Sequence, residues 1–294
     1  MNILITGYTG YLGSPFLNIL KKNYKNAKIF CISSRGVKKK NKLLNYKKLD
    51  LTNYADVKKY IAKIKPKILF HFAWKINFSN YQNSLDNFIS LQFSKNLYFL
   101  FCKYGGKQAY FVGSDQEYDD NSKICREKES KKKKHNYYSL SKYYLYNYIN
   151  KTSKNFNSQF TWFRVFPSYG SILESPKRLI PSLIISAIKD KKILIKNPHK
   201  KINLLHVKDV ARAMHLVFIK NITGIVNIAS KKKIKILDIK KFIYGVTSKI
   251  KYSNVLDLPK IELKNLNKIS FREKIEINQN LIKLKNIYKK KFNI

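Results

Sequence analysis

A tyrosine and a lysine, Tyr138 and Lys142, stand four residues apart in a stretch expected to form a helix over 137–149. This spacing places both side chains on one helix face. A free tyrosine has a pKa of about 10, too high for proton transfer near neutrality, and a neighbouring ammonium lowers that pKa because it favours the phenolate. The pair could therefore move a proton to or from a substrate oxygen. In a chain with 21 tyrosines the spacing also arises by chance, but Ser114 directly after a predicted strand over 108–113 supports the catalytic interpretation.

Three glycines, Gly7, Gly10 and Gly13, follow a short apolar run at 3–5. The pattern predicts a strand, a turn and a helix. Glycines let the backbone approach a pyrophosphate closely, and the helix N-terminus offers N–H groups and a partial positive charge. The alternative is a strand–helix turn that binds nothing. We predict that the turn holds the pyrophosphate of a dinucleotide through Gly7, Thr9, Gly10, Tyr11, Leu12 and Gly13.

The first half of the chain alternates strands and helices, which predicts an α/β fold with a Rossmann-like, doubly wound parallel sheet. Strands are expected at 3–5, 28–32, 67–72, 108–113 and 160–166, with another ending at 49–52, and helices at 55–64, 87–104 and 137–149.

The pattern changes after about residue 167, and we expect a small C-terminal substrate-binding cap in the same compact unit. A helix at 180–188, a helix beginning at 206–213, a strand at 224–228 and a capping box at 270–273 for a last helix are predicted. The predicted division is a dinucleotide-binding domain at 1–166 plus about 204–230, and a cap at 167–203 and 231–294.

Composition limits the class of protein. A chain of 294 residues, 44% hydrophobic, can bury a sizeable core. Its three cysteines, Cys31, Cys102 and Cys125, are far apart and lack metal-ligand spacing, which indicates a reducing compartment and no metal site. Since no basic segment precedes the first apolar run and no apolar run reaches membrane-spanning length, we expect a cytoplasmic protein without a signal peptide or a membrane partner.

The net charge is +43. One explanation is an AT-rich genome, which favours lysine codons and spreads lysines over solvated faces. The other is a polyanion-binding surface. Lysine runs at 38–40, 131–134 and 231–233 lie between predicted elements, and arginine, the better residue for bidentate phosphate contacts, is scarce. We favour the first explanation and expect no nucleic-acid partner.

The second predicted strand ends in Ser33, Ser34 and Arg35. An acid there would bond the adenosine ribose and repel a 2′-phosphate, whereas hydroxyls and a guanidinium suit the 2′-phosphate of NADP. We therefore predict NADP(H), with NAD as the alternative; a solvated loop that tolerates Arg35 is the neutral explanation.

The motifs resemble those of the extended short-chain dehydrogenase/reductases, the NAD-dependent epimerase/dehydratase family. The glycine turn resembles TGxxGxxG, and Ser114 to Tyr118 resembles Ser/Thr-x-x-x-Tyr. The resemblance extends over about residues 1–230, through segments at 163–170, 178–181 and 205–211 that resemble LRxxxxYG, the loop after it and IHVDDVA. It implies a triad: Ser114 bonds the substrate oxygen, Tyr138 passes the proton, and Lys142 tunes the tyrosine and holds the nicotinamide ribose.

The resemblance also implies further cofactor contacts. In relatives of this family an acid that matches Asp50 contacts the adenine, and the next residue packs on the adenine ring. Residues after the fourth strand line the cofactor. Phe72 could equally be ordinary core, and His71 is expected to be a hydrogen-bonded core histidine. The implied set is Asp50, Leu51, Phe72, Ala73, Trp74, Phe166 and Ser168.

Two departures from the family concern the substrate region. Sugar 4,6-dehydratases carry Thr-Asp-Glu, but this chain has Ser114, Asp115 and Gln116, and an amide cannot act as the base. Ile202 stands where relatives place a diphosphate-binding arginine. Arg178 is our candidate for that anion, against a surface ion pair as the alternative.

The sequence thus predicts an NADPH-dependent reductase for the C4 keto group of a nucleoside-diphosphate 4-keto sugar in surface-polysaccharide biosynthesis. The alternative is an NAD-dependent 4-epimerase; a 4,6-dehydratase and a non-catalytic dinucleotide- or RNA-binding protein are less favoured. Ser114, Asp115, Gln116 and Arg178 are the expected substrate contacts. The resemblance also implies a homodimer through the helices at 87–104 and 137–149.

Overall fold

The computed structural model describes residues 1–35, 44–77, 79–119, 124–128, 136–250 and 260–292. Its centre is a seven-stranded parallel sheet in the order β11-β7-β5-β4-β1-β2-β3. The predicted Rossmann-like α/β fold is confirmed. The strands are β1 (Asn2–Thr6), β2 (Lys28–Ser33), β3 (Leu44–Lys48), β4 (Ile68–His71), β5 (Gln108–Ser114), β7 (Gln159–Val165) and β11 (Gly224–Ile228).

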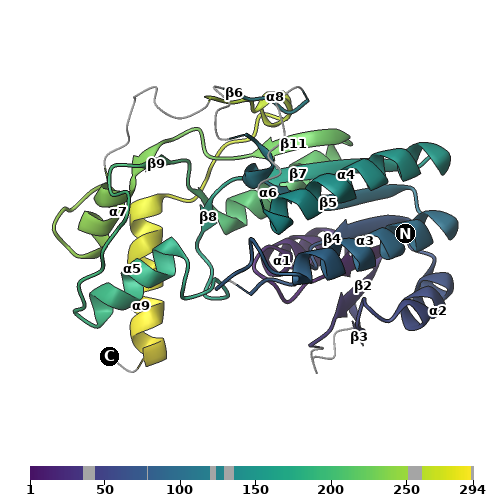
Figure 1. The fold of residues 1–294 in the computed structure, drawn as a ribbon, viewed down its shortest axis with the longest axis horizontal. Helices are drawn as coiled ribbons and strands as arrows, with labels where there is room; N and C mark the ends of the chain where they lie inside the picture. Colours follow the sequence, from purple (N-terminus) through teal and green to yellow (C-terminus); the bar gives the residue numbers. More distant parts are fainter. Residues whose placement is uncertain (36–43, 78, 120–123, 129–135, 251–259, 293–294) are drawn as a thin grey trace.

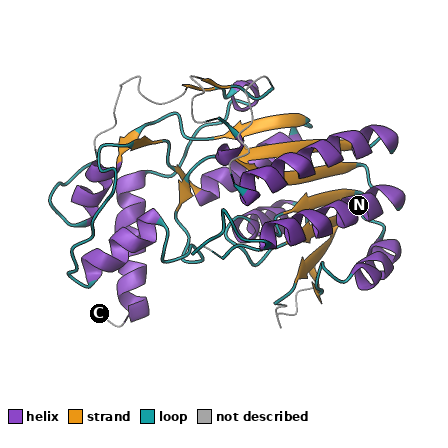
Figure 2. Cartoon of the chain, viewed as in Figure 1, coloured by secondary structure: helices purple, strands orange, loops and turns teal. Residues whose placement is uncertain are grey.

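Helices cover both faces of the sheet (Figures 1 and 2). Successive side chains of β1 alternate between the faces, so Ile3 and Ile5 pack in one core cluster and Leu4 in the other. Both faces are buried, which is why the strands are continuous apolar runs. One face carries α1 (Gly13–Asn23) and α6 (Val207–Ile219), and the other carries α2 (Tyr54–Ile64), α3 (Asp86–Lys103) and α4 (Tyr137–Asn155).

A third core cluster lies in the cap, beyond the carboxyl ends of the strands (Figure 1). It packs helices α5 (Leu179–Ile188), α7 (Ile236–Ile243) and α9 (Ile277–Phe292) against one another. Two short strand pairs lead into it: β8 (Ser168–Tyr169) with β10 (Leu205–His206), and β9 (Lys201–Ile202) with β12 (Ile234–Lys235).

The chain returns to the sheet before its last helix. Strand β13 (Lys260–Ile261) pairs with β6 (Ile124–Cys125), and helix α8 (Lys264–Lys268) follows. Side chains of this segment, including Leu266 and Phe271, pack in the cluster that α1 and α6 cover. No described helix combines the length and the apolar character that a bilayer crossing requires.

The predicted capping box at 270–273 is wrong. Ser270 has a left-handed backbone (φ 52°), whereas an N-cap residue is extended. Glu273 accepts instead from Ser230 Oγ at 2.9 Å and from Lys231 N at 3.0 Å. Helix α9 begins at Ile277, so a long-range contact uses the carboxylate that the sequence pattern assigned to capping.

Another boundary also differs from the prediction. Residues 49–52 were expected to end a strand, but β3 ends at Lys48. The carboxylate of Asp50 accepts from the amide and the hydroxyl of Thr52, both at 2.9 Å, and this local turn replaces the ladder hydrogen bonds of a strand.

Candidate active site

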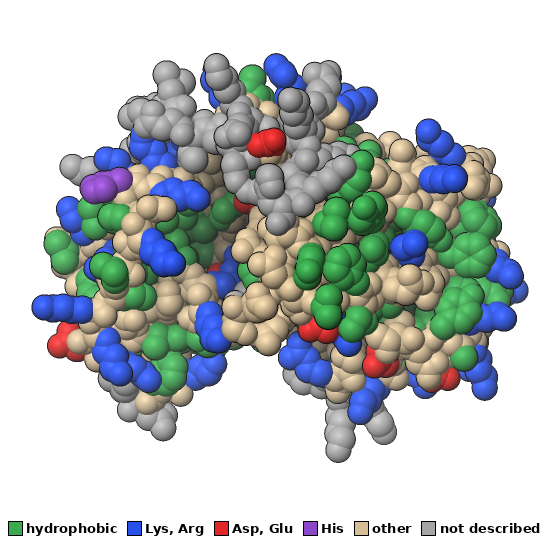
Figure 3. Space-filling model, in the orientation of Figure 1, with side chains coloured by type: hydrophobic (Ala, Val, Ile, Leu, Met, Phe, Trp, Pro, Cys, Tyr) green, Lys and Arg blue, Asp and Glu red, His purple; other side chains and the backbone are tan. Residues whose placement is uncertain are grey.

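The predicted site residues come from the carboxyl ends of neighbouring parallel strands. Strands β1, β2, β4, β5 and β7 end at the same edge of the sheet, next to the cap (Figure 1). Figure 3 shows that the surface is hollowed between these two parts of the molecule. Ligands of open α/β sheets bind at this edge, because loops from several strands converge there.

The glycine turn has the geometry that a dinucleotide needs. Gly7 adopts φ 66°, and a Cβ there would lie 2.6 Å from the backbone nitrogen of Ala73. Helix α1 begins at Gly13, and the N-cap Leu12 makes no side-chain cap bond. Ser14 N already donates to Gly10 O at 3.0 Å and Pro15 has no N–H, so the helix offers an anion the positive end of its dipole more than a row of free donors. The residues present therefore fit the pyrophosphate of a dinucleotide.

The end of β2 lies beside this turn. Ser33 Oγ is 3.1 Å from Thr9 Oγ1 and accepts from Arg35 N at 3.3 Å. Ser33 is buried, while Ser34 and Arg35 are exposed. The structure thus brings hydroxyls and a guanidinium-bearing residue to the place where an adenosine ribose follows the pyrophosphate.

Asp50 and Leu51 lie in the turn after β3. Asp50 is exposed, and its hydrogen bonds from Thr52 hold the pKa of its carboxyl below the usual value. Leu51 packs into the core cluster that α2, α3 and α4 cover. The hydrogen-bonding capacity of Asp50 is therefore partly used within its own turn.

The residues after β4 connect the turn to the proton-transfer residues. Phe72 N donates to Thr6 O at 3.1 Å, and the Phe72 ring lies 5.3 Å from Phe16. Trp74 Nε1 donates to Asn87 Oδ1 at 2.9 Å, which fixes the indole at the start of α3.

His71 is the hydrogen-bonded core histidine that the sequence predicted. Its ring lies 2.7 Å from Thr6 Oγ1 and 2.8 Å from Ser94 Oγ. Burial lowers the pKa of His71 to about 3, so the ring stays neutral and structural.

Ser114, Tyr138 and Lys142 meet at the end of β5. Lys142 Nζ donates to Val112 O at 2.8 Å and lies 3.5 Å from the centre of the Trp74 ring and 5.6 Å from that of Tyr138. Burial lowers the pKa of Lys142 to about 7. The expected lowering of the Tyr138 pKa by Lys142 is wrong for the cofactor-free protein: burial raises the pKa of this phenol, and the group that opposes the rise is the hydrogen bond with Ser114. The three groups can share and move a proton.

Asp115 and Gln116 lie next to this triad. Ser114 Oγ donates to Asp115 Oδ1 at 3.0 Å, and burial raises the pKa of Asp115. Gln116 Nε2 donates to Tyr81 OH at 2.5 Å, and its oxygen accepts from Gln82 at 3.1 Å. The Tyr81 ring lies edge-on to Tyr138, 5.3 Å away. Sequence reasoning missed Tyr81, because nothing in the sequence pattern distinguishes it from the other tyrosines.

A buried ion pair underneath the site was also missed. Glu117 Oε2 is 3.0 Å from Arg164 Nε, and both side chains are 1% exposed. Glu117 also bonds the backbone N–H of Ser114 at 2.8 Å. The signal was present, since a charged residue stands inside the apolar strand over 160–166 and needs a partner.

Tyr11, Ser168 and Arg178 join the glycine turn to the cap. Tyr11 OH donates to Ser168 Oγ at 3.1 Å, and Arg178 Nη2 donates to Ser168 O at 3.1 Å. Arg178 Nε also lies 3.3 Å from buried Glu174, whose pKa burial raises to about 7. Arg178, the N-cap residue of α5, thus has a carboxylate already beside it. Phe166 packs on the Tyr118 ring, 6.0 Å away.

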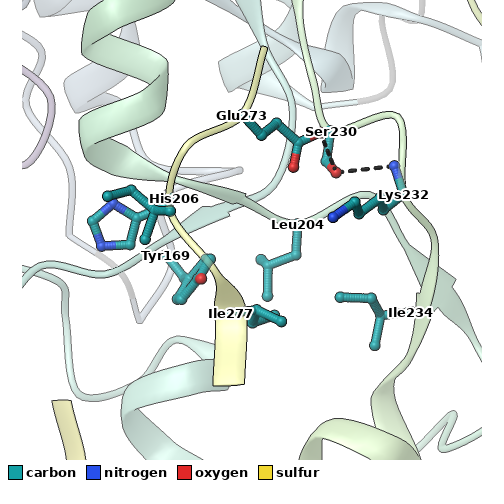
Figure 4. Close-up of a pocket in the computed structure, with 9 residues that line it drawn as sticks. Tyr169, Leu204, His206, Ser230, Lys232, Ile234, Glu273 and Ile277 are labelled. Carbon is teal, nitrogen blue, oxygen red and sulfur yellow. Dashed lines mark hydrogen bonds between the residues drawn. The ribbon is translucent and has the colours of Figure 1, made fainter. Parts of the chain in front are cut away.

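Other features do not join the triad. Ile202 lies in β9 and packs at the edge of the cap core. A small enclosed cavity of about 10 Å³, lined by His206, Ser230 and Glu273 among others, lies at the base of the cap (Figure 4). It has room for about one water molecule. Within the described ranges, no three His, Cys, Asp or Glu residues gather as metal ligands.

The fold and the site define a dinucleotide-binding α/β protein with a tyrosine–lysine pair at its cofactor edge. The chain matches the NAD dependent epimerase/dehydratase family over residues 3–229. It therefore belongs to this family, and the resemblance drawn from the sequence is confirmed.

Two relatives illustrate the similarity in sequence. A dTDP-D-glucose 4,6-dehydratase of Dictyostelium discoideum is 27% identical over 274 residues, covering 83% of this chain and 62% of that protein. A trifunctional UDP-glucose 4,6-dehydratase/UDP-4-keto-6-deoxy-D-glucose 3,5-epimerase/UDP-4-keto-L-rhamnose-reductase of Arabidopsis thaliana is 25% identical, covering 86% and 40%. This chain spans less than two thirds of the length of either relative.

Two solved structures illustrate the similarity in fold. The UDP-glucose 4-epimerase of Thermotoga maritima, with UDP-glucose, superposes with a TM-score of 0.82 at 16% identity over 99% of this chain and 100% of that one. The UDP-glucuronic acid 4-epimerase of Bacillus cereus, with UDP-glucuronic acid and NAD, gives 0.79 at 18% over 96% of each chain.

The position of Lys142 over the Trp74 ring predicts a spectroscopic titration. The chain has two tryptophans, and the charge of an ammonium 3.5 Å from an indole changes its emission. Because burial lowers the pKa of Lys142 to about 7, the tryptophan fluorescence of the cofactor-free protein should show a sigmoidal step centred near pH 7. Lys142→Met and Trp74→Phe should each remove the step. If the fluorescence step persists in each of these two variants, the placement of the Lys142 ammonium over the Trp74 ring is contradicted.

Proposed function

We propose that this chain reduces the C4 keto group of a nucleoside-diphosphate 4-keto (deoxy) sugar with NADPH, in surface-polysaccharide biosynthesis. The observation that carries the proposal is the meeting of Ser114, Tyr138 and Lys142 beside a glycine turn that fits a dinucleotide. The bound nicotinamide supplies the hydride. The chain supplies orientation and the proton.

The three residues divide the proton chemistry. Ser114 and Tyr138 hydrogen-bond the C4 oxygen and polarise the carbonyl. Tyr138 gives its proton to that oxygen as negative charge develops on it, and Lys142 stabilises the phenolate that remains. The same ammonium is placed to hold the nicotinamide ribose.

The substrate class is supported by the relatives and by Gln116. The similar proteins act on, or bind, nucleotide sugars according to their names. Gln116 replaces the glutamate of the 4,6-dehydratases, and its amide is held by Tyr81 and Gln82. An amide cannot accept the proton that water elimination requires, so we favour reduction over dehydration. We propose Arg178, Asp115 and Gln116 as the substrate contacts.

The second candidate is a nucleotide-sugar 4-epimerase that uses tightly held NAD. It is favoured by the fold similarity to 4-epimerases whose structures hold NAD. The cofactor distinguishes the two: NAD that stays bound through purification favours the epimerase, and exchange of free NADPH favours the reductase. The three buried free cysteines support a reducing compartment, and we propose the cytoplasm.

We also propose a homodimer through α3 and α4. Hydrophobic side chains gather over these helices (Figure 3), and Leu85, Ile89 and Tyr137 are 68%, 42% and 42% exposed. An apolar surface that two helices share is suited to a symmetric partner.

Removal of the phenol tests the reaction. Tyr138→Phe should lower kcat by at least about 100-fold, because the proton donor is lost, while NADPH binding is unchanged. The measurement is NADPH oxidation across a panel of nucleoside-diphosphate 4-keto sugars. Tyr144→Phe, on the exposed side of the same helix, is the matched control and should retain activity. Normal turnover by Tyr138→Phe, or no turnover by the unmodified protein on any sugar, would overturn the proposal.

Removal of the guanidinium at the end of β2 tests the cofactor. Arg35→Ala should raise the KM for NADPH by about tenfold or more, the size expected for a lost charge-assisted hydrogen bond, and should leave the KM for NADH nearly unchanged. Lys58→Ala, an exposed lysine of α2, serves as the control for loss of one positive charge. Equal use of NADPH and NADH by the unmodified protein would argue for NAD.

A charge in the apolar patch tests the dimer. The mass from light scattering should be that of two chains, and Ile89→Glu should reduce it to one because it buries a carboxylate in the interface. Ile219→Glu places the same charge on a residue 50% exposed at the end of α6 and should leave the dimer intact. A single-chain mass for the unmodified protein at micromolar concentration would refute the proposal.

A further inference from the structure

Glu117 is a buried carboxylate directly beneath the proton-transfer residues. It lies in the short 3₁₀ helix η1 (Asp115–Glu117), and its side chain is 1% exposed. Its oxygens accept from Ser114 N at 2.8 Å, from Trp162 Nε1 at 3.0 and 3.1 Å, and from Arg164 Nε at 3.0 Å. One side chain therefore connects the serine of the triad to strand β7.

The guanidinium of Arg164, which pairs with Glu117, also has several fixed contacts. Arg164 is buried, its Nη1 donates to Glu127 O at 3.4 Å, and its Cζ lies 4.6 Å from the centre of the Tyr118 ring. A buried ion pair costs desolvation energy that its own attraction often only balances, so stability alone is a weak reason for it. The pair is better explained by what it positions.

The packing around Glu117 leaves little freedom. A Cβ on Gly113 would collide with the Glu117 carboxylate and the Trp162 indole. Ser114 caps η1 in a capping box whose second partner is Glu117. The backbone of Ser114, and with it the direction of its hydroxyl, is thus set by the carboxylate three residues later.

The charge of Glu117 also acts on the lysine. Burial lowers the pKa of Lys142 to about 7, and the Glu117 carboxylate opposes that shift. Without it the pKa of Lys142 falls further, and less of the side chain is cationic near neutral pH.

We propose that Glu117 is a positioning residue: it fixes Ser114 against β7, and its carboxylate, packed against Gly113, places a negative charge one residue from the Val112 carbonyl that holds the Lys142 ammonium. The inference rests on the roles proposed for Ser114, Tyr138 and Lys142. Glu117 itself touches neither substrate nor cofactor in this arrangement, and acts through the residues that do.

Other ionisable groups face the two residues and must be controlled. They are His71 of β4, Tyr138 and Tyr146 of α4, Asp115 of η1, Tyr118 directly after it, and Arg164 of β7. His71 has a pKa of about 3 and stays neutral across the relevant range.

The test is the tryptophan fluorescence titration of the cofactor-free protein, which needs no substrate. Glu117→Gln keeps the shape and one acceptor oxygen, turns the other oxygen into an NH2 group, and removes the charge. It should move the Lys142 step by about one pH unit to lower pH, the size expected for loss of one opposing buried charge. Glu127→Gln is the control for another buried glutamate, bonded to Asn227 and Asn265, whose own pKa burial raises to about 7. It should leave the step in place, which shows that the step near pH 7 belongs to Lys142 and not to this carboxyl.

A second variant guards against misfolding. Glu117→Gln leaves Arg164 buried without its counter-ion, so the double variant Glu117→Gln/Arg164→Met is titrated as well. Its fluorescence step should also move to lower pH, but by less, because the positive charge of Arg164 is removed together with the negative charge of Glu117. If the step stays in place in whichever variant folds, the proposal is wrong. Because this readout is independent of turnover, it fails separately from the proposed reductase activity.

Discussion

The buried ammonium of Lys142 is the feature on which the site depends. A charge in a water-poor place costs free energy, and here burial brings the pKa of Lys142 down to about 7. The charge is tolerated because the Val112 carbonyl and the Trp74 ring contact it, and because the negative charge of Glu117 opposes the effect of burial on its pKa. A lysine held near its titration point gains or loses its charge with small changes around it, whereas burial raises the pKa of the Tyr138 phenol and the hydrogen bond with Ser114 opposes that rise.

The site is assembled across a long stretch of sequence because a parallel sheet brings the ends of its strands together. The glycine turn after β1 contacts the backbone after β4, and the serine after β5 is tied to β7 through Glu117. Tyr11 and Ser168 extend the same chain of contacts into the cap. The glycine turn, Ser114 and the start of the cap thus lie along one edge of the sheet and are connected through these contacts.

The reactions open to the site depend on which residues around Tyr138 can donate or accept a proton. Asp115 is an acid whose pKa burial raises, but its neighbour Gln116 is an amide fixed by Tyr81 and Gln82. Proton donation to a carbonyl oxygen is possible in such a place, whereas Gln116 cannot act as the base that removes a carbon-bound proton. This is why a family that includes dehydratases is compatible with a reductase here.

The sequence by itself determined the features that depend on local spacing. The apolar runs predicted most strands of the sheet, the glycines at 7, 10 and 13 predicted the turn, and a spacing of four placed Tyr138 and Lys142 on one helix face, because each pattern is completed within about one element. The same kind of argument failed at Ser270 and Glu273, where a suitable spacing lies on a left-handed backbone and the carboxylate bonds Ser230 instead.

Only the tertiary structure decided the partners of the buried charges. Glu117 and Arg164 stand 47 residues apart, and nothing along the chain pairs them. The sequence offered Arg178 as an anion contact or as part of an ion pair, and the structure adds that Glu174 lies beside it; the sequence likewise did not show that the Lys142 ammonium lies over the Trp74 ring. Which charged groups pair depends on where the strands end in space. The sequence does not show this, because it does not show the order of the strands in the sheet.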